Sequence, residues 1–359
     1  MYKTEAWIIE SNFKGLRKGE VTFDALSKDE VLVKPIYGCF EGNMLHAIEK
    51  LPVDLNKQRK EEKIVIGNAG VVQIDSIGDE VDGLKAGDIC IYFCNGNWDQ
   101  YGYPITISGY DCKGTIGLFA KLTKVHKKNL IRIPSDSSIS LQQWAAFSLR
   151  YITAWSNWKI AHKCYLSQMD VQNQEINVLA WGGGVSFAEL SLAVKQGCKG
   201  YMFASMSSRL KMIKNEGIYP IDRTQFNKAN FEQEVLSYVN NITDGKMASI
   251  FVDNIGGNLF NLTLKCLARQ GVIATSGWKN GAILPLVRSI ECINRHLFVH
   301  THYASYDEGL DAVKFAVNNN WIPEVDSEDY EWEDILDLVN DYKTSESISY
   351  FPIYKVNDL

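Results

Sequence analysis

Three consecutive glycines at positions 182–184 are the residues whose type and spacing point most directly to chemistry. They follow an apolar run, residues 176–181, that is typical of a buried strand, and they precede residues 185–196, whose pattern predicts an amphipathic helix. Glycine lets the backbone approach a pyrophosphate, and a helix N-terminus presents free N–H groups. The turn therefore predicts a dinucleotide site that includes Gly182, Gly183, Gly184 and Val185.

The glycine turn departs from the usual dinucleotide pattern. The spacing G-x-G-x-x-G would place glycines at Trp181 and Ser186, and this chain has neither. The alternative interpretation is a tight strand-to-helix turn in some other α/β domain.

The end of the next predicted strand, residues 201–204, bears on the choice between NADH and NADPH. An acidic residue there would bind the ribose 2′-hydroxyl, whereas small polar and basic residues accommodate a 2′-phosphate. The chain has no Asp or Glu at this point, and an arginine can bond a phosphate through two N–H groups. The alternative is that Arg209 and Lys211 are ordinary solvated helix residues. The residues predict NADPH, bound by Ser205, Ser207, Ser208 and Arg209.

The elements that must position this site alternate between strand and helix from residue 176 to about residue 277. This alternation indicates a parallel sheet with crossover helices. The first 150 residues instead carry short β-type runs punctuated by glycine, as in a small β-barrel. Predicted strands are 30–37, 64–72, 88–93, 121–125, 249–252, 272–275 and 349–354, and further predicted helices are 141–161, 257–268, 305–319 and 332–344.

Composition restricts the class of protein. The 359 residues are 46% hydrophobic and 22% charged, with a net charge of −6, which argues against a nucleic-acid partner. No apolar run approaches the roughly 20 residues of a membrane span, and the first residues do not resemble a secretory signal, so a cytoplasmic location is expected. The eight cysteines contain no CxxC pair and are expected to be reduced and mostly buried.

Four stretches together resemble the medium-chain dehydrogenase/reductase superfamily over nearly the whole chain. They are GNAGVVQIDSIGDEVDGLKAGDICI, GTIGLFAKLTKVHKKNLIRIPSDSSISLQQWAAFSLRYITAW, the glycine turn, and FVDNIGGNLFNLTLKCLARQGVIATSGW. The resemblance implies a GroES-like β-rich catalytic domain, residues 1–150 and 305–359, and a Rossmann doubly wound parallel-sheet cofactor domain, residues 151–304. It adds to the cofactor site Thr153, Asn254, Ser276 and Gly277.

Zinc divides this superfamily. Its zinc-dependent members have an early cysteine, a Gly-His-Glu step and a third ligand. The matching step here is Gly67-Asn68-Ala69, and Glu41 rather than Cys39 falls at the early position. Because a catalytic zinc needs about three protein ligands, the resemblance implies a zinc-independent enzyme. Such members often reduce activated double bonds, as quinone and enoyl-thioester reductases do.

A closer resemblance is to the crotonyl-CoA reductase branch. It depends on NWDQYG, on Ser108-Gly109-Tyr110-Asp111, on the G-x-x-G-x-x-A run at 114–120, and on the V-L-A-W-G start of the glycine turn. The carboxylation residues of that branch have no match here, so reduction alone is expected.

Without a metal, negative charge that develops on a substrate carbonyl must be met by N–H or O–H donors. The resemblance places Asn43 at a polar active-site position and Asn68 at a zinc-ligand position. Glu41 has apolar and small neighbours, so desolvation should raise its pKa and suit it to general acid catalysis. The alternative for each is a structural hydrogen bond and, for Tyr110, the packing of a turn. The catalytic candidates are Glu41, Asn43, Asn68 and Tyr110.

His296, His300 and His302 follow the spacing H-x3-H-x-H, which raises the question of a metal site. No acidic residue stands beside them, and a domain edge or dimer seam is the preferred interpretation. Relatives commonly dimerise through the edge of the cofactor-domain sheet, here near residues 284–300, so a homodimer is expected.

The sequence thus predicts a zinc-independent, NADPH-dependent reductase of an α,β-unsaturated carbonyl, with an enoyl thioester as one candidate substrate. Two alternatives stay open. One is a carbonyl reductase of the same fold, and the other is a non-catalytic NADPH-binding protein.

Overall fold

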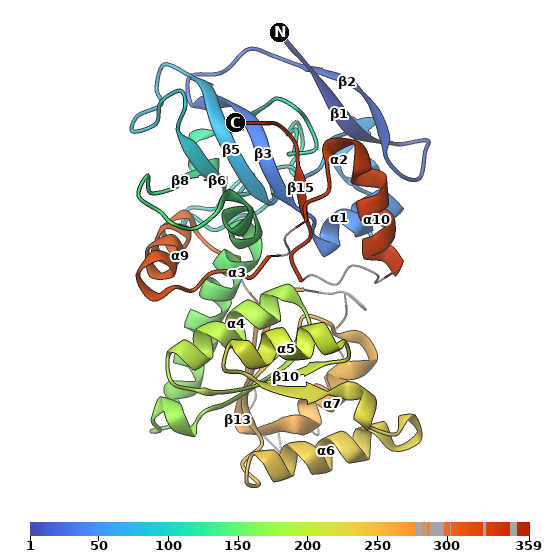
Figure 1. The fold of residues 1–359 in the computed structure, drawn as a ribbon, viewed down its shortest axis with the longest axis vertical. Coiled ribbons are helices and arrows are strands. Elements are labelled where there is room, and N and C mark those ends of the chain that lie inside the picture. The colour runs from blue at the N-terminus through green and yellow to red at the C-terminus, as the bar shows by residue number, and fades with distance from the viewer. Residues whose placement is uncertain (278–282, 284–285, 288–297, 302, 326–327, 345–349) are drawn as a thin grey trace. The chain divides into compact units, whose positions relative to one another are not determined.

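The computed structural model describes residues 1–277, 283, 286–287, 298–301, 303–325, 328–344 and 350–359, which fold into two compact units. The first unit comprises Met1–Ile152 and Ser305–Leu359, and the second comprises Thr153–Ala304. Both chain ends lie in the first unit, and the second unit is inserted between its two parts (Figure 1).

The first unit contains two antiparallel sheets. In the smaller, β1 (Tyr2–Glu10) pairs with β2 (Arg17–Phe23) and with the short β4 (Lys63–Ile64). The larger has the order β15-β3-β5-β6-β8, with β7 also paired to β3. Alternate apolar side chains of its strands point inward and form a buried core. Its strands are β3 (Glu30–Cys39), β5 (Gly70–Ile77), β6 (Ile89–Tyr92), β7 (Thr123–His126), β8 (Leu130–Arg132) and β15 (Ile353–Lys355).

Helices from both parts of the chain pack in the first unit. The buried face of α1, which includes Met44 and Ile48, belongs to the same core as Ile335 and Leu338 of α10. The start of α9 follows a local signal, because Ser305 and Glu308 form a reciprocal capping box. The helices are α1 (Gly42–Glu49), α2 (Leu55–Arg59), α9 (Tyr306–Asn319) and α10 (Ile335–Thr344), and α3 (Leu141–Leu166) continues into the second unit.

The predicted strand at 64–72 is wrong as a single strand. The chain bends at Gly67, whose φ of +124° is a conformation that favours glycine. A Cβ at Gly67 would lie only 2.6 Å from the backbone nitrogen of Leu118, so the bend fits closely against a neighbouring segment. The bend separates β4 from β5 and leaves Asn68 between them.

The second unit contains a parallel sheet whose described strands have the order β11-β10-β9-β12-β13-β14. Its strands are β9 (Asn177–Trp181), β10 (Lys199–Ala204), β11 (Tyr219–Asp222), β12 (Ala248–Val252), β13 (Leu267–Thr275) and β14 (Phe298–Thr301). Its own helices are α4 (Gly184–Lys195), α5 (Ser207–Asn215), α6 (Phe231–Ile242) and α7 (Phe260–Cys266). The predicted helix at 257–268 is therefore shorter than expected, because residues 257–259 form a 3₁₀ turn and β13 begins at Leu267.

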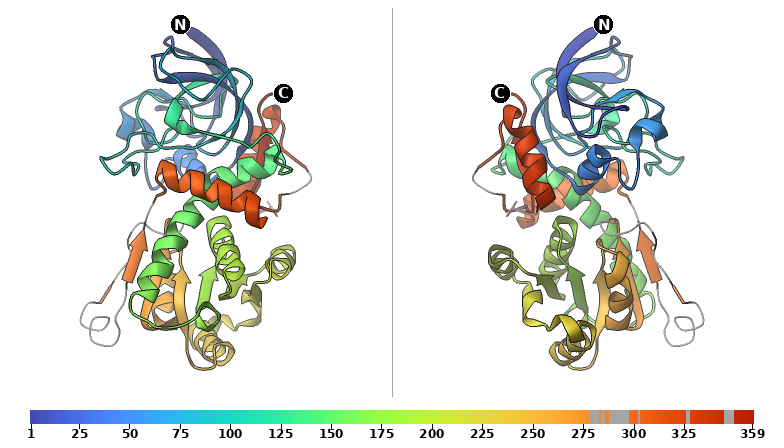
Figure 2. Two further views of the ribbon diagram at one scale, coloured as in Figure 1. Left: turned by 90° about the vertical axis from the view of Figure 1, so that its left-hand side faces the viewer. Right: turned by 90° about the vertical axis from the view of Figure 1, so that its right-hand side faces the viewer.

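Helices lie on both sides of this sheet (Figures 1 and 2). On one face, Leu179 and Phe251 share a buried apolar core with Val235 of α6 and Phe260 of α7. On the other side α4 packs closely, since a Cβ on Gly200 would meet the Val194 side chain at 2.8 Å. The sheet is thus covered in layers, and in sheets of this kind ligands bind at the carboxyl ends of the strands.

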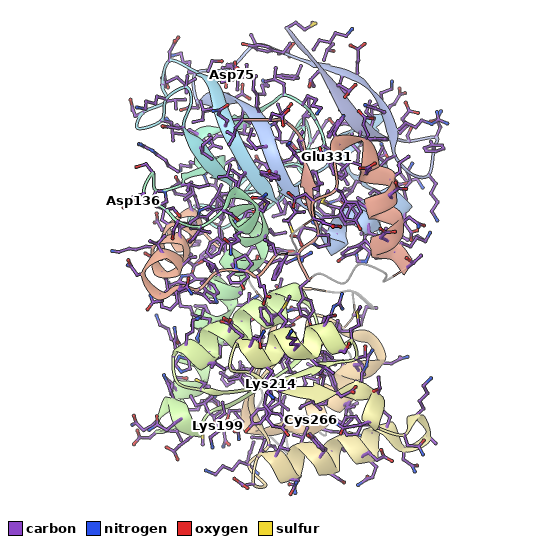
Figure 3. All side chains as sticks on the ribbon, in the orientation of Figure 1. Asp75, Asp136, Lys199, Lys214, Cys266 and Glu331 are labelled. Carbon is purple, nitrogen blue, oxygen red and sulfur yellow. The ribbon has the colours of Figure 1, made fainter. Side chains whose placement is uncertain are left out.

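Seven cysteines lie in the described residues, and all are free thiols, six of them buried. Cys266, at the end of α7, is labelled in Figure 3. The prediction of reduced and mostly buried cysteines is confirmed for these seven. In the parts of the chain that the structure describes, no helix combines the length and apolarity that crossing a membrane requires.

Candidate active-site residues and dinucleotide turn

Three strand ends meet in the first unit. The Cys39 N–H donates to the Ala69 carbonyl at 3.1 Å, and the Phe40 N–H donates to the Pro352 carbonyl at 2.8 Å. The segment after β3, the segment before β5 and the segment before β15 are thereby tied together. Side chains from these three segments lie at the same end of the larger sheet.

Gly38 allows the Tyr354 ring to pack directly on β3. A Cβ at Gly38 would lie 2.1 Å from Cζ of Tyr354, so only glycine leaves room for the ring. The ring is fully buried, with its centroid 4.9 Å from that of Phe119. Burial raises the pKa of the Tyr354 phenol, with a smaller effect from Cys39 and Glu41, so it stays neutral. Its hydroxyl has no hydrogen-bond partner among the described residues.

Glu41 and Arg150 form a buried ion pair. The Arg150 Nε donates to Glu41 Oε2 at 2.7 Å, and its Nη2 donates to the Phe40 carbonyl at 2.8 Å. Glu41 is 5% exposed and Arg150 is 4% exposed. The guanidinium also lies 5.4 Å from the ring centroid of Phe351. One atom of each partner, Glu41 Oε1 and Arg150 Nη1, has no partner among the described residues.

Burial raises the pKa of the Glu41 carboxyl, while Arg150 and the Cys39 thiol act in the opposite direction. For Arg150, burial disfavours the charge, but Glu41 and Cys39 more than offset it and raise the pKa of the guanidinium. A pair in direct contact keeps its charges, because a neutral Glu41 would leave a buried arginine uncompensated. The expected desolvation of Glu41 is present, yet its contact with Arg150 favours a carboxylate over a free acid.

Asn43 lies close to Glu41 in the chain, whereas Asn68 lies in the segment that the bond from Cys39 to Ala69 holds at the same sheet end. Asn43 is the second residue of α1, a helix for which Glu41 is the N-cap residue, although the Glu41 side chain makes no capping bond. Asn68 lies in the bend before β5 and is 1% exposed. The side-chain oxygens of Asn43 and Asn68 have no hydrogen-bond partner among the described residues. Both oxygens are thus buried acceptors at the end of the sheet where Glu41 lies.

Tyr110 belongs to a packed loop. It is 8% exposed and is part of the core cluster that includes Ile66 and Phe119. Its carbonyl accepts a bond from Arg59 Nη1 at 3.0 Å, and the same arginine also donates to the Thr115 carbonyl at 2.8 Å. This setting favours the alternative of a residue that packs a turn.

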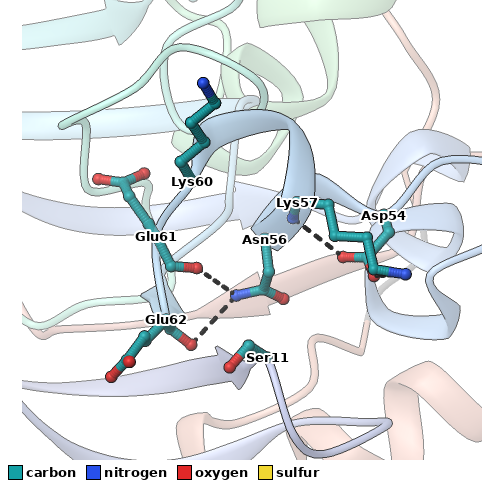
Figure 4. Close-up of a pocket in the computed structure, with 7 residues that line it drawn as sticks. All are labelled: Ser11, Asp54, Asn56, Lys57, Lys60, Glu61 and Glu62. Atoms are coloured by element: carbon teal, nitrogen blue, oxygen red, sulfur yellow. Dashed lines mark hydrogen bonds and ion pairs between the residues drawn. The ribbon is translucent and has the colours of Figure 1, made fainter.

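A polar pocket of about 220 Å³ lies beside α2 (Figure 4). The Asn56 amide braces its wall by donating to the carbonyls of Glu61 and Glu62 at 3.0 and 3.2 Å. Two lysines and three acidic residues line it, so the pocket has no excess of positive charge that would attract an anionic ligand. Its lining residues are Ser11, Asp54, Asn56, Lys57, Lys60, Glu61 and Glu62.

Metal-binding groups do not gather in the described part of the chain, where no three His, Cys, Asp or Glu side chains converge. His296 and His302 lie outside the described residues, and of His300 only the backbone position in β14 is described. The question that their spacing raised is therefore not tested.

In the second unit, the turn between β9 and α4 requires a glycine at position 183. Its φ of +148° and ψ of 155° belong to a region open essentially to glycine alone. The space above it is open, because a Cβ there would meet only Ser186 Oγ, at 3.9 Å. The turn leads directly into α4, whose N-terminus offers N–H groups to an anion.

The two departures from the glycine pattern each have a structural reason. Trp181 points into the core, where its Nε1 donates to Thr263 Oγ1 at 2.7 Å and Thr263 donates to Asp253 Oδ2 at 2.8 Å. Ser186 is fully buried, and its Oγ accepts from Asn254 Nδ2 at 3.1 Å. The larger side chains therefore pack and bond beneath the turn.

Asn254 links three turns at the carboxyl ends of the strands. While its Nδ2 donates to Ser186, its Oδ1 accepts from the backbone N–H of Ser276 at 2.8 Å and of Gly277 at 3.1 Å. Gly277 packs tightly here, since a Cβ would lie 2.9 Å from the Asn254 carbonyl oxygen. The structure thus brings together three predicted cofactor residues, Asn254, Ser276 and Gly277, and the same amide reaches the glycine turn through Ser186.

The polar residues after β10 are accessible. Ser205, Ser207 and Ser208 are exposed at the end of β10 and the start of α5, and Arg209 is half-buried on α5. No acidic side chain stands among them. Thr153, also predicted to bind the cofactor, is 7% exposed where α3 enters the second unit.

Sequence reasoning missed Arg150 and the pair Asp253 and Thr263. Arg150 stands in an otherwise apolar stretch of a predicted helix, and a charge in such a stretch was the available signal. Asp253 accepts the backbone N–H groups of Ile255 and Gly256 as well as the Thr263 hydroxyl. The spacing of these residues in the sequence does not predict this hydrogen-bond network.

Comparison with known proteins gives no match to any family model. The quinone oxidoreductase-like protein 2 homolog of Nematostella vectensis is 24% identical over 253 residues, which cover 70% of this chain and 60% of that protein. The match therefore spans less than two thirds of the relative's length.

Two solved structures are similar over almost the whole chain. The crotonyl-CoA carboxylase/reductase AntE in complex with NADP has a TM-score of 0.79 at 18% identity, with 98% of this chain and 94% of that chain covered. The alcohol dehydrogenase of Aeropyrum pernix has a TM-score of 0.81 at 18% identity, with 98% and 99% covered. At these identities the likeness shows the fold. The predicted fold class, a GroES-like β-rich domain with a Rossmann doubly wound sheet, is confirmed, and the resemblance to the medium-chain dehydrogenase/reductase superfamily is supported.

Proposed function

We propose that this chain is an NADPH-dependent reductase of an activated C=C bond whose substrate is an α,β-unsaturated carbonyl compound. The observation that carries the proposal is the turn at Gly183 together with the Asn254 clamp, by which we mean the hydrogen bonds of the Asn254 amide to Ser186, Ser276 and Gly277. The likeness to a crotonyl-CoA carboxylase/reductase with NADP and to a quinone oxidoreductase-like protein supports it. An enoyl thioester is the substrate class to test first.

The residues of the second unit fit a dinucleotide. Gly183 leaves open space where a side chain would block a pyrophosphate, and the N-terminus of α4 follows it at once. Asn254 holds the ends of β12 and β13 against this turn, so the surface that meets the ligand is fixed in advance. When bound, the reduced nicotinamide supplies a hydride.

NADPH is preferred over NADH because of the residues after β10. Ser205, Ser207 and Ser208 are exposed donors, and Arg209 brings a positive charge to the same segment. We expect Arg209→Ala to weaken NADPH binding by about 1–3 kcal/mol and to leave NADH binding unchanged, since a charged hydrogen bond to the 2′-phosphate is lost. Fluorescence titration of the nicotinamide measures both affinities.

The matched control for this prediction is Arg223→Ala, which removes an exposed arginine from the same unit. This variant should bind NADPH as the wild type does. An equal loss of NADH affinity in Arg209→Ala would assign Arg209 to the general stability of α5.

In the first unit, the proposed chemistry is metal-free. Glu41, Asn43 and Asn68 bring acceptor oxygens, which have no partners among the described residues, to one end of the larger sheet, where they can accept hydrogen bonds from donor groups of a substrate or from water. Their proposed task is to orient the substrate and to pass a proton, while Tyr110 serves packing. Reduction without zinc is part of the proposal, and metal analysis of the active protein tests it.

The test of the function is a two-step measurement on the purified, metal-analysed full chain. NADPH and NADH are first titrated, and NADPH consumption is then followed with crotonyl-CoA, with 3-penten-2-one and with the saturated ketone 2-pentanone. Consumption with the first two, and a product that has lost its C=C bond, supports the proposal. Tight NADPH binding without turnover of any of the three would leave a non-catalytic NADPH-binding protein.

A carbonyl reductase of the same fold is the second candidate. The Aeropyrum pernix alcohol dehydrogenase is as similar in structure to this chain as the crotonyl-CoA carboxylase/reductase AntE is. The same assay separates the two. Reduction of 2-pentanone, or an allylic alcohol formed from 3-penten-2-one, would favour this alternative.

A homodimer is proposed through β14, the edge strand of the described sheet in the second unit. An edge strand offers unpaired backbone groups to another chain. Phe298 and Val299 of this strand are 45% and 39% exposed, which is a large apolar exposure for two consecutive positions. A second copy that pairs along β14 would cover both.

A further inference from the structure

We propose that Arg150 is a catalytic residue of the reductase, and that its Nη1 group donates to the carbonyl oxygen of the substrate. This inference rests on the proposed function, because it assigns the group that meets the negative charge in a metal-free site. The juxtaposition that carries it is a fixed, buried guanidinium with one nitrogen unused, at the sheet end where Glu41 lies.

The guanidinium is held in place before any ligand binds. Nε donates to Glu41 Oε2, Nη2 donates to the Phe40 carbonyl, and the Phe351 ring lies beside the plane. Two bonds at 2.7 and 2.8 Å leave the flat group no freedom to turn. Preorganised donors of this kind stabilise charge at no reorganisation cost during the reaction.

The contact with Glu41 is not the bidentate arrangement that Arg–carboxylate pairs frequently adopt. A fork-to-fork pair would use two N–H groups and both carboxylate oxygens. Here one such bond is present, and Arg150 Nη1 and Glu41 Oε1 have no hydrogen-bond partner among the residues that the structure describes. Buried ion pairs are costly unless their remaining hydrogen-bonding groups are satisfied, so a ligand that uses these atoms gains much.

Further polar atoms without partners gather at the same sheet end. The Asn68 side-chain oxygen lies directly before β5, and the Tyr354 hydroxyl projects from β15, which pairs with β3. Both residues are almost completely buried. Among the described residues, Arg150 is the one member of this group with a permanent positive charge, which suits it to an oxygen that becomes negative.

The chemistry needs such a charge. When a hydride adds to the β-carbon of an enone or enoyl thioester, the C=C electron pair moves into the bond between the α-carbon and the carbonyl carbon. The carbonyl π pair then moves onto oxygen as an enolate. A proton from water at the α-carbon restores the carbonyl and completes the addition of one hydride and one proton. Nη1 of Arg150 would bond the oxygen most strongly in the enolate stage, where stabilisation increases the rate.

The experiment measures how a probe binds and forms its enolate at Arg150, so it does not depend on turnover. Acetoacetyl-CoA, whose enolate has its own ultraviolet band, is titrated into the NADP⁺-loaded full-length protein. The wild type should bind the probe and increase the enolate band. Arg150→Met should weaken probe binding roughly 10- to 100-fold and abolish the added band. Arg150→Lys, which keeps the charge but not the fork, should restore only part of it.

The double variant Glu41→Gln/Arg150→Met separates the effect of Arg150 on the probe from its effect on folding. The double variant leaves no unpaired buried charge, so it should fold even where Arg150→Met alone is unstable. Circular dichroism and NADPH affinity check the fold. We expect the folded double variant to lack the enolate band.

The outcomes are distinct. A folded double variant that keeps the enolate band would overturn the proposal, because Arg150 would then only neutralise Glu41. A wild type that does not bind the probe would overturn it as well. An Arg150-dependent enolate band in a protein that reduces no enone would support the oxyanion site and remove the reductase function instead.

Discussion

At the residue scale, Glu189 is the side chain that least fits its surroundings. It is fully buried on α4, and neither carboxylate oxygen has a hydrogen-bond partner among the described residues. Burial raises the pKa of this carboxyl well above 4.5. A group with a raised pKa binds a proton more tightly in the folded than in the unfolded chain. Its contribution is therefore fully present below about pH 4.5 and is lost as the pH rises towards its folded-state pKa.

Replacement of this carboxyl by an apolar side chain, Glu189→Met, should accordingly stabilise the protein at neutral and alkaline pH. The free energy of unfolding should rise by about 1–3 kcal/mol at pH 8, because the variant removes a buried polar group without partners. The gain should shrink as the pH falls towards 4.5. Urea unfolding at several pH values measures it, with the exposed Glu232→Met as the control. A gain that is equal at all pH values would show that the carboxyl does not titrate between the two states.

The candidate site could be predicted from the sequence only where a motif or a neighbour carried the information. Gly183 and Asn254 stand in recognisable patterns, and in the structure the Ser186 hydroxyl lies near both of them. Arg150 comes from a helix more than 100 positions after Glu41, and no local pattern relates the two. Such pairings are set by tertiary packing, which a single sequence does not display.

At the scale of elements, the turn between β9 and α4 shows how a change in a sequence motif is matched by a change in the residues that hold the turn. By the usual pattern, Ser186 is a departure from a glycine. In the structure its hydroxyl is the acceptor for Asn254, which in turn bonds the ends of the other two turns. The serine thus replaces the close packing of a glycine with a hydrogen bond.

We therefore predict that Ser186→Gly, which restores one of the two missing glycines of the usual motif, destabilises the protein. The variant leaves Asn254 Nδ2 without its partner and adds glycine to a helix, so the free energy of unfolding should fall by about 1–3 kcal/mol. NADPH affinity should also fall. Ser191→Gly, another buried serine of the same helix, is a reference for the cost of glycine alone. Tighter NADPH binding by Ser186→Gly would contradict the role assigned to the clamp.

Periodicity predicted several elements of both units, including β9, β10, α3 and α9, within a few residues, but it did not single out α1, α5 or α6. It failed where backbone geometry decided the outcome. Gly67 breaks an apolar run that reads as one strand, because its positive φ and the backbone of Leu118 require a bend. The turn at residues 256–257, with two glycines at positive φ, likewise delays the start of α7.

At the scale of the whole molecule, the exposed edge of the second unit's sheet leads to a prediction about assembly. If two copies pair along β14, Val299→Lys should convert a dimer to a monomer, because a charged side chain on an edge strand opposes pairing. Light scattering coupled to gel filtration measures the mass. Val317→Lys, at an exposed valine of the first unit, should leave the mass unchanged. A wild type that is already monomeric at micromolar concentration would exclude this interface.

The pairing of β15 with β3 also constrains how the chain is completed during translation. Cys39 of β3 cannot pair with Ile353 of β15 until the ribosome has added roughly 300 further residues. The inserted second unit is synthesised in between and can close its own sheet first, since domains tend to fold as units as they emerge. Until residues 353–355 arrive, β3 presents an open edge and a bare strip at Gly38 where the Tyr354 ring will lie. A nascent chain that pauses late in synthesis would thus leave the end of β3 at residues 37–39 without its partner strand.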